Sequence, residues 1–193
     1  MTGIIGKKLG MTRVIQDDGR VIPITVVQCE PNEVTQVKTV EKDGYPAIVL
    51  GISMLKKPTK NRKFHNLKEF RHEEGAEVKK GDKVSIDIFN EGDTVRVSGK
   101  SKGKGFQGVI KRHNMGRGPM SHGSHHKRQP GSVGACASPG RIHRGKKLPG
   151  RMGNQKVTLS KTQIIYMDKK NNLIGIKGAL PGGNKSIITI TKV

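Results

Sequence analysis

Residues 94–108, TVRVSGKSKGKGFQG, mark the point where one kind of sequence gives way to another. Thr94 to Val97 alternate polar and apolar side chains, which is the pattern of a β-strand with one buried face. From Lys100 onward, glycines and lysines replace that pattern, and strand-like sequence returns only near residue 156. This stretch therefore divides the chain into β-structure and a long basic segment.

The sequence on both sides of the basic segment predicts many short strands. Asp17-Asp18-Gly19 separates the candidate strands 13–15 and 21–27 and is a strong hairpin signal. Short strands with a turn signal about every eight to twelve residues are typical of a barrel or a sandwich. We therefore predict a mainly β protein with a closed β-barrel domain. The other candidate strands are 33–40, 47–52, 84–88, 94–97, 156–159, 163–167, 173–176 and 186–191.

The predicted barrel is discontinuous in sequence. Residues 1–97 and 156–193 form it, and residues 98–155 form a long, irregular basic loop extension between the two parts. A small helical insertion is predicted at about residues 55–75, with its helix over residues 66–74. A second short helix is predicted over residues 106–113, where apolar and basic side chains fall on opposite sides.

The charge distribution points to a polyanionic partner. The chain has 37 Lys and Arg against 15 Asp and Glu, which gives a formal net charge of +22. Between Asp93 and Asp168 there is no acidic residue, and that gap contains 16 Lys and Arg and five of the seven histidines. Such an excess repels itself in a compact state unless a partner neutralises it. No apolar stretch is long enough to span a bilayer, and Met1 to Met11 lacks the apolar core of a secretory signal, so we expect nucleic acid rather than membrane.

The basic segment itself has two interpretations. It is either a disordered linker or an arm that becomes ordered when RNA neutralises it. Glycines spaced among the basic residues favour the arm, because they let the backbone approach phosphates closely. With no Trp, two Tyr and four Phe in the chain, we expect contacts to phosphate and sugar rather than a platform of stacked aromatic rings.

Two motifs in the segment raise catalytic or cofactor alternatives. Gly103 to Gly108 fits the GxGxxG pattern, but the acidic residue that a dinucleotide fold places about 20 residues later is missing. Cys136, with Arg141 and His143 nearby, has the composition of an activated thiol but sits in sequence typical of a loop. We expect no enzyme activity and no cofactor.

A metal site is the other alternative for this segment. His122, His125, His126 and His143 with Cys136 lack the paired spacing that zinc ligands show, so we expect no metal. The two cysteines, Cys29 and Cys136, form no CxxC pair and no disulfide framework, which suits a reducing cytoplasm.

Four blocks of sequence carry a family resemblance. They are residues 1–12 (MTGIIGKKLGMT), residues 101–108 (SKGKGFQG) followed by Lys111-Arg112, residues 130–153 (PGSVG through GKKLPGRMG) and residues 177–182 (KGALPG). In this order they resemble the large-subunit ribosomal protein L3 family, in its compact bacterial form, over essentially the whole chain.

The resemblance implies a structural constituent of the large ribosomal subunit, located in the cytoplasm. Members are primary rRNA-binding proteins that bind near the 3′ end of the large-subunit rRNA and nucleate subunit assembly. Their barrel lies on the subunit surface, and their loop extends toward the peptidyl transferase centre. The implied partners are large-subunit rRNA and large-subunit proteins fourteen and nineteen, with no membrane and no small-molecule substrate. By motif, the tip of the loop is Ser132, Val133, Gly134, Ala135, Cys136, Ala137, Ser138 and Pro139. Many bacterial members have a glutamine, sometimes methylated, where this chain has Ala137.

The basic residues of the extension and of the amino-terminal motif are the predicted rRNA contacts. For Lys7, Lys8 and Arg13, a solvated surface is the competing interpretation. A non-ribosomal architectural binder of DNA or RNA, and an enzyme that uses the Gly-rich loop or Cys136, remain as alternative functions. The predicted contacts are Lys7, Lys8, Arg13, Lys100, Lys102, Lys104, Lys111, Arg112, His113, Arg117, His122, His125, His126, Lys127, Arg128, Arg141, His143, Arg144, Lys146, Lys147 and Arg151.

Overall fold

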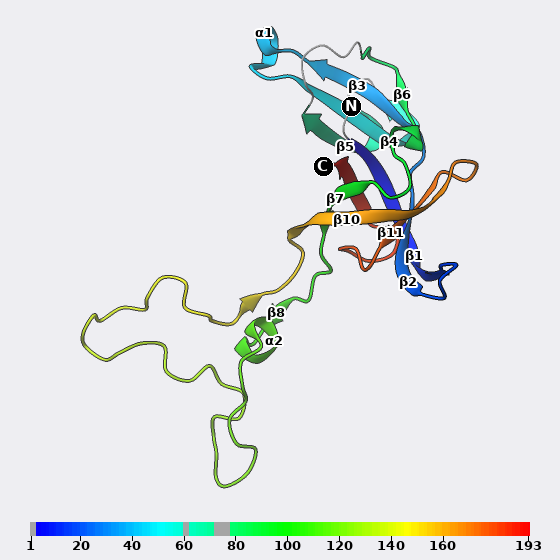
Figure 1. Cartoon of the computed structure of the whole chain (residues 1–193). Coiled ribbons are helices and arrows are strands. Elements are labelled where there is room, and N and C mark those ends of the chain that lie inside the picture. The colour runs from blue at the N-terminus through cyan, green and yellow to red at the C-terminus, as the bar shows by residue number, and fades with distance from the viewer. Residues whose placement is uncertain (1–2, 60–61, 72–77) are drawn as a thin grey trace. The chain divides into compact units, whose positions relative to one another are not determined.

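The computed structural model describes residues 3–59, 62–71 and 78–193 (Figure 1). It divides the chain into two units, one made of residues 1–101 and 156–193 and the other of residues 102–155. Strands predominate, and the prediction of a mainly β protein is confirmed.

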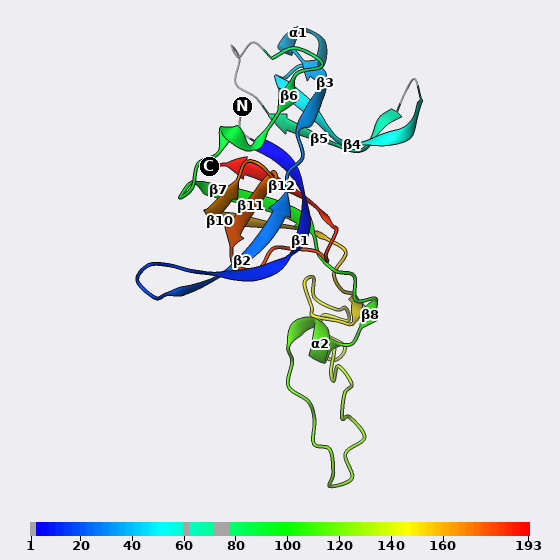
Figure 2. The ribbon, with the colours of Figure 1, turned by 90° about the vertical axis from the view of Figure 1, so that its right-hand side faces the viewer.

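Six strands of the first unit pair in a cycle. They are β1 (Gly3–Ile15), β12 (Ile187–Lys192), β7 (Thr94–Lys100), β10 (Lys156–Asp168), β11 (Leu173–Lys177) and β2 (Val21–Gln28), in this order. All neighbours are antiparallel, and β2 pairs back with β1, so each strand has two hydrogen-bonded neighbours. Figure 2 shows the β1–β2 hairpin, whose turn contains Gly19 at φ 78°. The hairpin predicted from Asp17-Asp18-Gly19 is confirmed.

The interior of the six-stranded sheet is filled by β-branched side chains. Val95 and Val97 on β7 are buried and alternate with exposed neighbours, as do Ile188 and Ile190 on β12 with half-buried ones. Each fully buried side chain of this size stabilises the fold by about 1.5–3 kcal/mol relative to an exposed one. β7 continues to Lys100, so residues 98–100, which the sequence pattern assigns to the extension, belong to this sheet.

Strand β10 is one strand where the sequence predicts two, over 156–159 and 163–167. The register of β10 against β7 shifts between Leu159 and Thr162. Such a bulge inserts residues that change which face the following side chains occupy, so the alternation breaks while the strand continues. The interruption in the sequence pattern is therefore a bulge and not a turn.

A second sheet in the same unit has the strand order β5-β4-β3-β6. Its strands are β3 (Asn32–Lys38), β4 (Ala47–Thr59), β5 (Arg62–Arg71) and β6 (Lys83–Val84), and the short helix α1 (Val40–Asp43) joins β3 to β4. Ile5 of β1 belongs to its core, whereas the adjacent Ile4 belongs to the core of the six-stranded sheet. Neighbouring side chains of one strand point to opposite faces, so β1 links the two cores.

The predicted helical insertion at about residues 55–75 is wrong in its described part. β4 and β5 form a long hairpin there (Figure 2), in which Phe64 pairs with Met54 and Phe70 with Ile48. Phe64 and Phe70 are both buried and lie an even number of residues apart, as one face of a strand requires. Pairing with β4 outweighs the helical tendency of residues 66–71. Residues 60–61 and 72–75 of this prediction lie outside the described residues.

The predicted strand over residues 84–88 is also partly wrong. Only Lys83–Val84 pairs as β6, and Ile86–Ile88 forms the 3₁₀ turn η1. The Phe89 amide donates to the Ile86 carbonyl at 3.0 Å. Ile86 and Phe89 lie three residues apart and are both buried, which matches the three-residue repeat of a 3₁₀ helix.

The second unit, residues 102–155, contains little regular structure. β8 (Phe106–Gln107) pairs with β9 (Gly150–Arg151), and α2 spans Val109–His113. The helix predicted over residues 106–113 is therefore confirmed only from Val109 onward, because residues 106–107 are used in strand pairing. Asn114 ends α2 in the left-handed conformation, with φ 55°. We refer to residues 102–155 below as the extension.

Candidate nucleic-acid interface

The base of the extension is held by backbone contacts between its two arms. The Lys104 amide donates to the Met152 carbonyl, and the Met152 amide donates to the Gly105 carbonyl, each at 2.9 Å. Gly153 has φ 72°, and a Cβ atom there would overlap the carbonyl oxygen of Lys102. Glycine is therefore required at this point, because the conformation and the close approach both exclude a side chain.

Two predicted contact residues also hold the arms together. A terminal nitrogen of Arg112 donates to the Leu148 carbonyl at 2.8 Å, and Nε2 of His113 lies 3.0 Å from the same oxygen. The guanidinium of Arg112 also fills the space next to Gly150 where a Cβ would lie. Arg112 retains further N–H donors for a phosphate, but the first role of both side chains is to join α2 to the returning arm.

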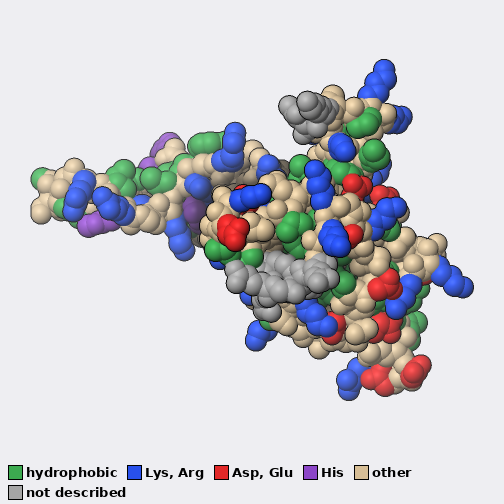
Figure 3. All heavy atoms as spheres, turned by 90° about the horizontal axis from the view of Figure 1, so that it is seen from above, with side chains coloured by type: hydrophobic (Ala, Val, Ile, Leu, Met, Phe, Trp, Pro, Cys, Tyr) green, Lys and Arg blue, Asp and Glu red, His purple; other side chains and the backbone are tan. Residues whose placement is uncertain are grey.

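The remaining basic side chains of the extension are exposed. No acidic residue occurs between residues 102 and 155, and the ion pairs found in the described part of the chain all lie in the other unit. Figure 3 shows Lys, Arg and His side chains along the extension, while the acidic side chains on that face belong to the other unit. The exposed residues are Lys102, Lys104, Lys111, Arg117, His122, His125, His126, Lys127, Arg128, Arg141, His143, Arg144, Lys146, Lys147 and Arg151.

The predicted tip, Ser132 to Pro139, is exposed at every residue. Its backbone is shaped locally, by a hydrogen bond from the Ser132 hydroxyl to the Gly134 carbonyl at 2.9 Å. The Ser138–Pro139 peptide bond is cis. The tip therefore offers small side chains and backbone groups rather than charge.

Lys8 is predicted as a surface contact, but in the structure it lies in the protein interior. Its side chain is buried, with 7% relative exposure, and its ammonium donates to the carbonyls of Leu180 at 2.8 Å and Gly182 at 3.3 Å. Lys8 alternates with exposed Lys7 and shares the inner face of β1 with Ile4 and Gly6. We therefore remove Lys8 from the candidate interface, where Lys7 and Arg13 stay as exposed residues.

Two residues that could contact RNA are missed by the sequence pattern. Phe106 has 75% relative exposure, so its ring is free to stack on a base. Lys68, which falls in the wrongly predicted helix, lines a cleft of about 460 Å³ together with Lys100 and Lys156. The even spacing of Phe64 and Phe70 in the sequence is typical of one face of a strand, and it could have indicated that Lys68 lies on a strand. No sequence signal reveals the cleft, because strands far apart in the chain form it.

The two cysteines have different environments. Cys29 is buried in the core of the six-stranded sheet, and burial raises the pKa of its thiol to about 12. Cys136 is exposed at the tip.

Across residues 3–59, 62–71 and 78–193, no three His, Cys, Asp or Glu side chains are grouped closely enough to hold a metal ion. Within the same residues, no helix is both long and apolar enough to cross a membrane.

Comparison with known proteins assigns the chain to a family. The family model described as Ribosomal protein L3 matches residues 49–172. The chain is 48% identical to the large ribosomal subunit protein uL3 of Shouchella clausii, over 97% of this chain and 96% of that protein. It is 47% identical to the uL3 proteins of Halalkalibacterium halodurans and of a Geobacillus species, in each case over 97% of this chain and at least 94% of the relative. With matches of this extent, the chain belongs to the ribosomal protein L3 family.

Proposed function

We propose that this chain is a structural constituent of the large ribosomal subunit and a primary binder of its rRNA. In this role it binds near the 3′ end of the large-subunit rRNA and nucleates subunit assembly. The extension carries the proposal, because residues 102–155 contain 12 Lys and Arg, five His and no acid, and most of these side chains are exposed. No partner within the extension can neutralise this charge, so an external polyanion must do so.

The mechanism is electrostatic scaffolding. Each phosphate that a Lys or Arg neutralises releases condensed counterions, which makes affinity fall with salt by a slope of about 0.7–0.9 per contact. An irregular, glycine-rich backbone follows the shape of folded RNA more easily than a rigid helix does. The six strands act as a closed β-barrel that docks at the subunit surface, while the extension enters the RNA and directs residues 132–139 toward the peptidyl transferase centre.

The chain contributes no reacting group in this scheme and is not an enzyme. It acts on peptide-bond formation only by positioning RNA. Its partners are large-subunit rRNA and the neighbouring large-subunit proteins fourteen and nineteen, in the cytoplasm, without a cofactor, membrane or small-molecule substrate.

A sucrose gradient of cell lysate tests the proposal. Ribosomes washed in high salt are separated into subunits, and each peak is probed for this chain. We expect one copy per large subunit after the wash. Loss of the chain in the wash, or equal affinity of the purified chain for duplex DNA and for large-subunit rRNA, would instead favour a general architectural binder.

A further inference from the structure

A cleft between the two sheets of the first unit carries an inference about RNA contact outside the extension. It has a volume of about 460 Å³ and is lined by Asn66 and Lys68 of β5, Ser98 and Lys100 of β7, Lys156 of β10 and Ile187 of β12. Sites of about 300–1,000 Å³ are the size that holds a small ligand or one nucleotide.

The cleft is basic because its lysines are not neutralised. Lys68, Lys100 and Lys156 are exposed, and within the described residues none of their ammonium groups has an ion pair or a side-chain hydrogen bond. Lys100 and Lys156 are direct partners across the β7–β10 ladder. Like charges placed directly opposite each other destabilise a sheet, and an anion between them removes that repulsion.

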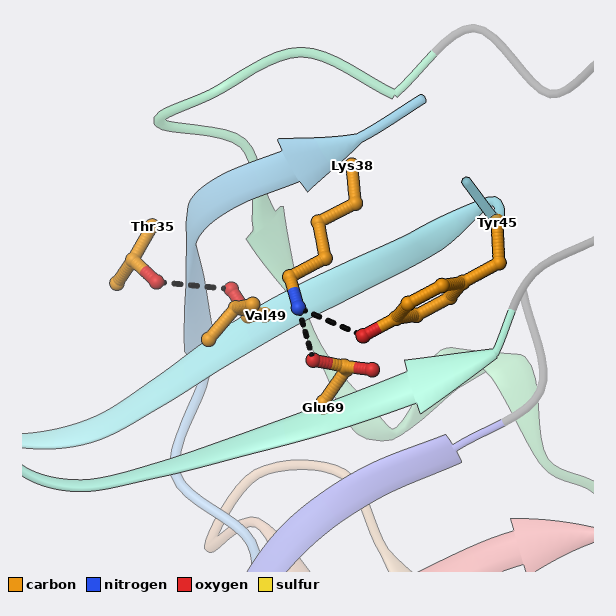
Figure 4. A network of polar contacts seen from close by, with 5 residues as sticks. All are labelled: Thr35, Lys38, Tyr45, Val49 and Glu69. Carbon is orange, nitrogen blue, oxygen red and sulfur yellow. Dashed lines mark hydrogen bonds and ion pairs between the residues drawn. The ribbon is translucent and has the colours of Figure 1, made fainter. Parts of the chain in front are cut away.

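The nearest acidic residue on β5 points away from the cleft. Glu69 follows Lys68, so its side chain lies on the opposite face of the strand. There it accepts a hydrogen bond from Lys38 at 2.6 Å, and Lys38 also donates to Tyr45 at 2.8 Å (Figure 4). Glu69 is therefore already paired, and the cleft face of β5 keeps the uncompensated charge of Lys68.

The walls of the cleft suit a nucleotide better than a bare anion. Ile187 is half-buried and gives an apolar surface for a base. The hydroxyl of Ser98 is already bonded to that of Thr158 at 2.8 Å. The half-buried side-chain amide of Asn66 makes no hydrogen bond to the described residues, and an amide offers one acceptor and two donors for the edge of a base.

We propose that this cleft binds a single nucleotide extruded from the rRNA, with its phosphate between Lys68, Lys100 and Lys156. Its base lies over Ile187, and Asn66 contacts the base edge. Proteins recognise RNA largely through unstacked bases of loops and bulges, which this geometry fits. The inference rests on the proposed rRNA-binding function and adds a second, defined contact outside the extension.

The test compares two triple variants of the full-length chain. The cleft variant is Lys68→Gln, Lys100→Gln and Lys156→Gln, and the control is Lys42→Gln, Lys57→Gln and Lys161→Gln, which removes the same charge from exposed positions outside the cleft. Binding to an rRNA fragment containing the 3′ region is measured across salt concentrations. We expect the cleft variant to bind at least about tenfold more weakly, with a salt slope smaller by about one because a single phosphate contact is lost, and the control to change little. A benzophenone side chain at position 66 is expected to cross-link to one nucleotide.

Three outcomes would count against the inference. If wild type fails to bind the fragment, the proposed function fails and the inference with it. If wild type binds but the two triple variants bind alike, only the cleft proposal is overturned. Displacement of the position-66 cross-link by millimolar free mononucleotide, without loss of RNA binding, would show a small-molecule site instead.

Discussion

The ammonium group of Lys8 lies 2.8 Å from the carbonyl oxygen of Leu180, in the interior of the first unit. The same ammonium donates a second hydrogen bond to the carbonyl oxygen of Gly182. The backbone of Gly182 adopts φ 95° and passes close to the carbonyl of Lys100. Pro181, between these residues, packs on Gly99. Lys8 therefore fixes the loop that supports the end of β7, where the chain leaves for the extension.

Substituting Lys8→Met is expected to lower the free energy of unfolding by about 2–3 kcal/mol. The change removes charge-assisted hydrogen bonds and leaves buried carbonyl oxygens unsatisfied. Urea denaturation followed by circular dichroism measures the effect. Lys7→Met is the matched control, because Lys7 is the exposed neighbour on the same strand, and it should change stability by less than about 0.5 kcal/mol. Equal effects of the two substitutions would contradict the buried role of Lys8.

The two thiols should differ sharply in reactivity. Because burial raises the pKa of Cys29 to about 12, its thiolate is scarce and inaccessible in the folded chain, whereas Cys136 is exposed. A chromogenic disulfide reagent at pH 8 is expected to titrate one thiol in native protein and two in denaturant. Cys136→Ser should abolish the native reaction without weakening RNA binding. A native signal that survives this substitution would mean that Cys29 is accessible.

The raised pKa of Cys29 also predicts a pH dependence of stability. The unfolded thiol, with an ordinary pKa of 9.0, loses its proton at a lower pH than the folded thiol does, so the unfolded state binds fewer protons between pH 9 and pH 12. Stability must therefore fall as pH rises through this window, by about 1.4 kcal/mol per pH unit at most. The measurement is the difference in free energy of unfolding between wild type and Cys29→Ala at pH 8 and pH 10. A constant difference would contradict the assignment.

Glu69 makes the second sheet sensitive to acid. Its hydrogen bond with Lys38, and next the one with Tyr45, lower the pKa of the carboxyl below its usual value. The pKa of Lys38 is raised by its hydrogen bonds with Glu69 and then with Tyr45. A depressed carboxyl pKa adds stability that is present above the unfolded pKa and is lost as pH falls through the folded one. Wild type should melt at a higher temperature than Glu69→Gln at pH 7, and the gap should narrow as the pH falls below the ordinary carboxyl pKa of 4.5. A gap of unchanged size at acid pH would exclude the ion pair as its cause.

Removing the extension should leave the first unit folded. Lys100 and Lys156 are direct partners in an antiparallel ladder, so an Asn-Gly pair in place of residues 101–155 can close β7 and β10 as a two-residue hairpin. Thermal unfolding of this variant should remain cooperative. It should enter large subunits poorly or yield slowly translating ones, and normal assembly with normal peptide-bond formation would contradict the role proposed for the extension.

The features that could be predicted from the sequence depend on local signals. Asp17-Asp18-Gly19 places a turn whatever the rest of the chain does, so the β1–β2 hairpin is predictable. The absence of acidic residues between Asp93 and Asp168 is likewise visible in the sequence alone, and the extension, residues 102–155, lies within that gap.

The errors come from contacts between distant residues. Residues 66–71 have a pattern compatible with a helix, and only pairing with β4 makes them a strand. Lys8 resembles a surface charge in the sequence, because no local rule shows that carbonyls near residue 180 surround its ammonium. The cleft at Lys68 requires both sheets to be in place, which no stretch of sequence encodes by itself.

The pairing of Lys100 with Lys156 has a topological consequence. The extension is a doubled chain whose two ends are anchored side by side, not a free tail. A tail can be drawn end-first through a ring of RNA that has already closed, but a doubled loop needs an opening wide enough for two strands at once. If the extension occupies the interior of the folded rRNA, the RNA must close around it. The shape of the protein thus favours its arrival before the surrounding helices are locked together.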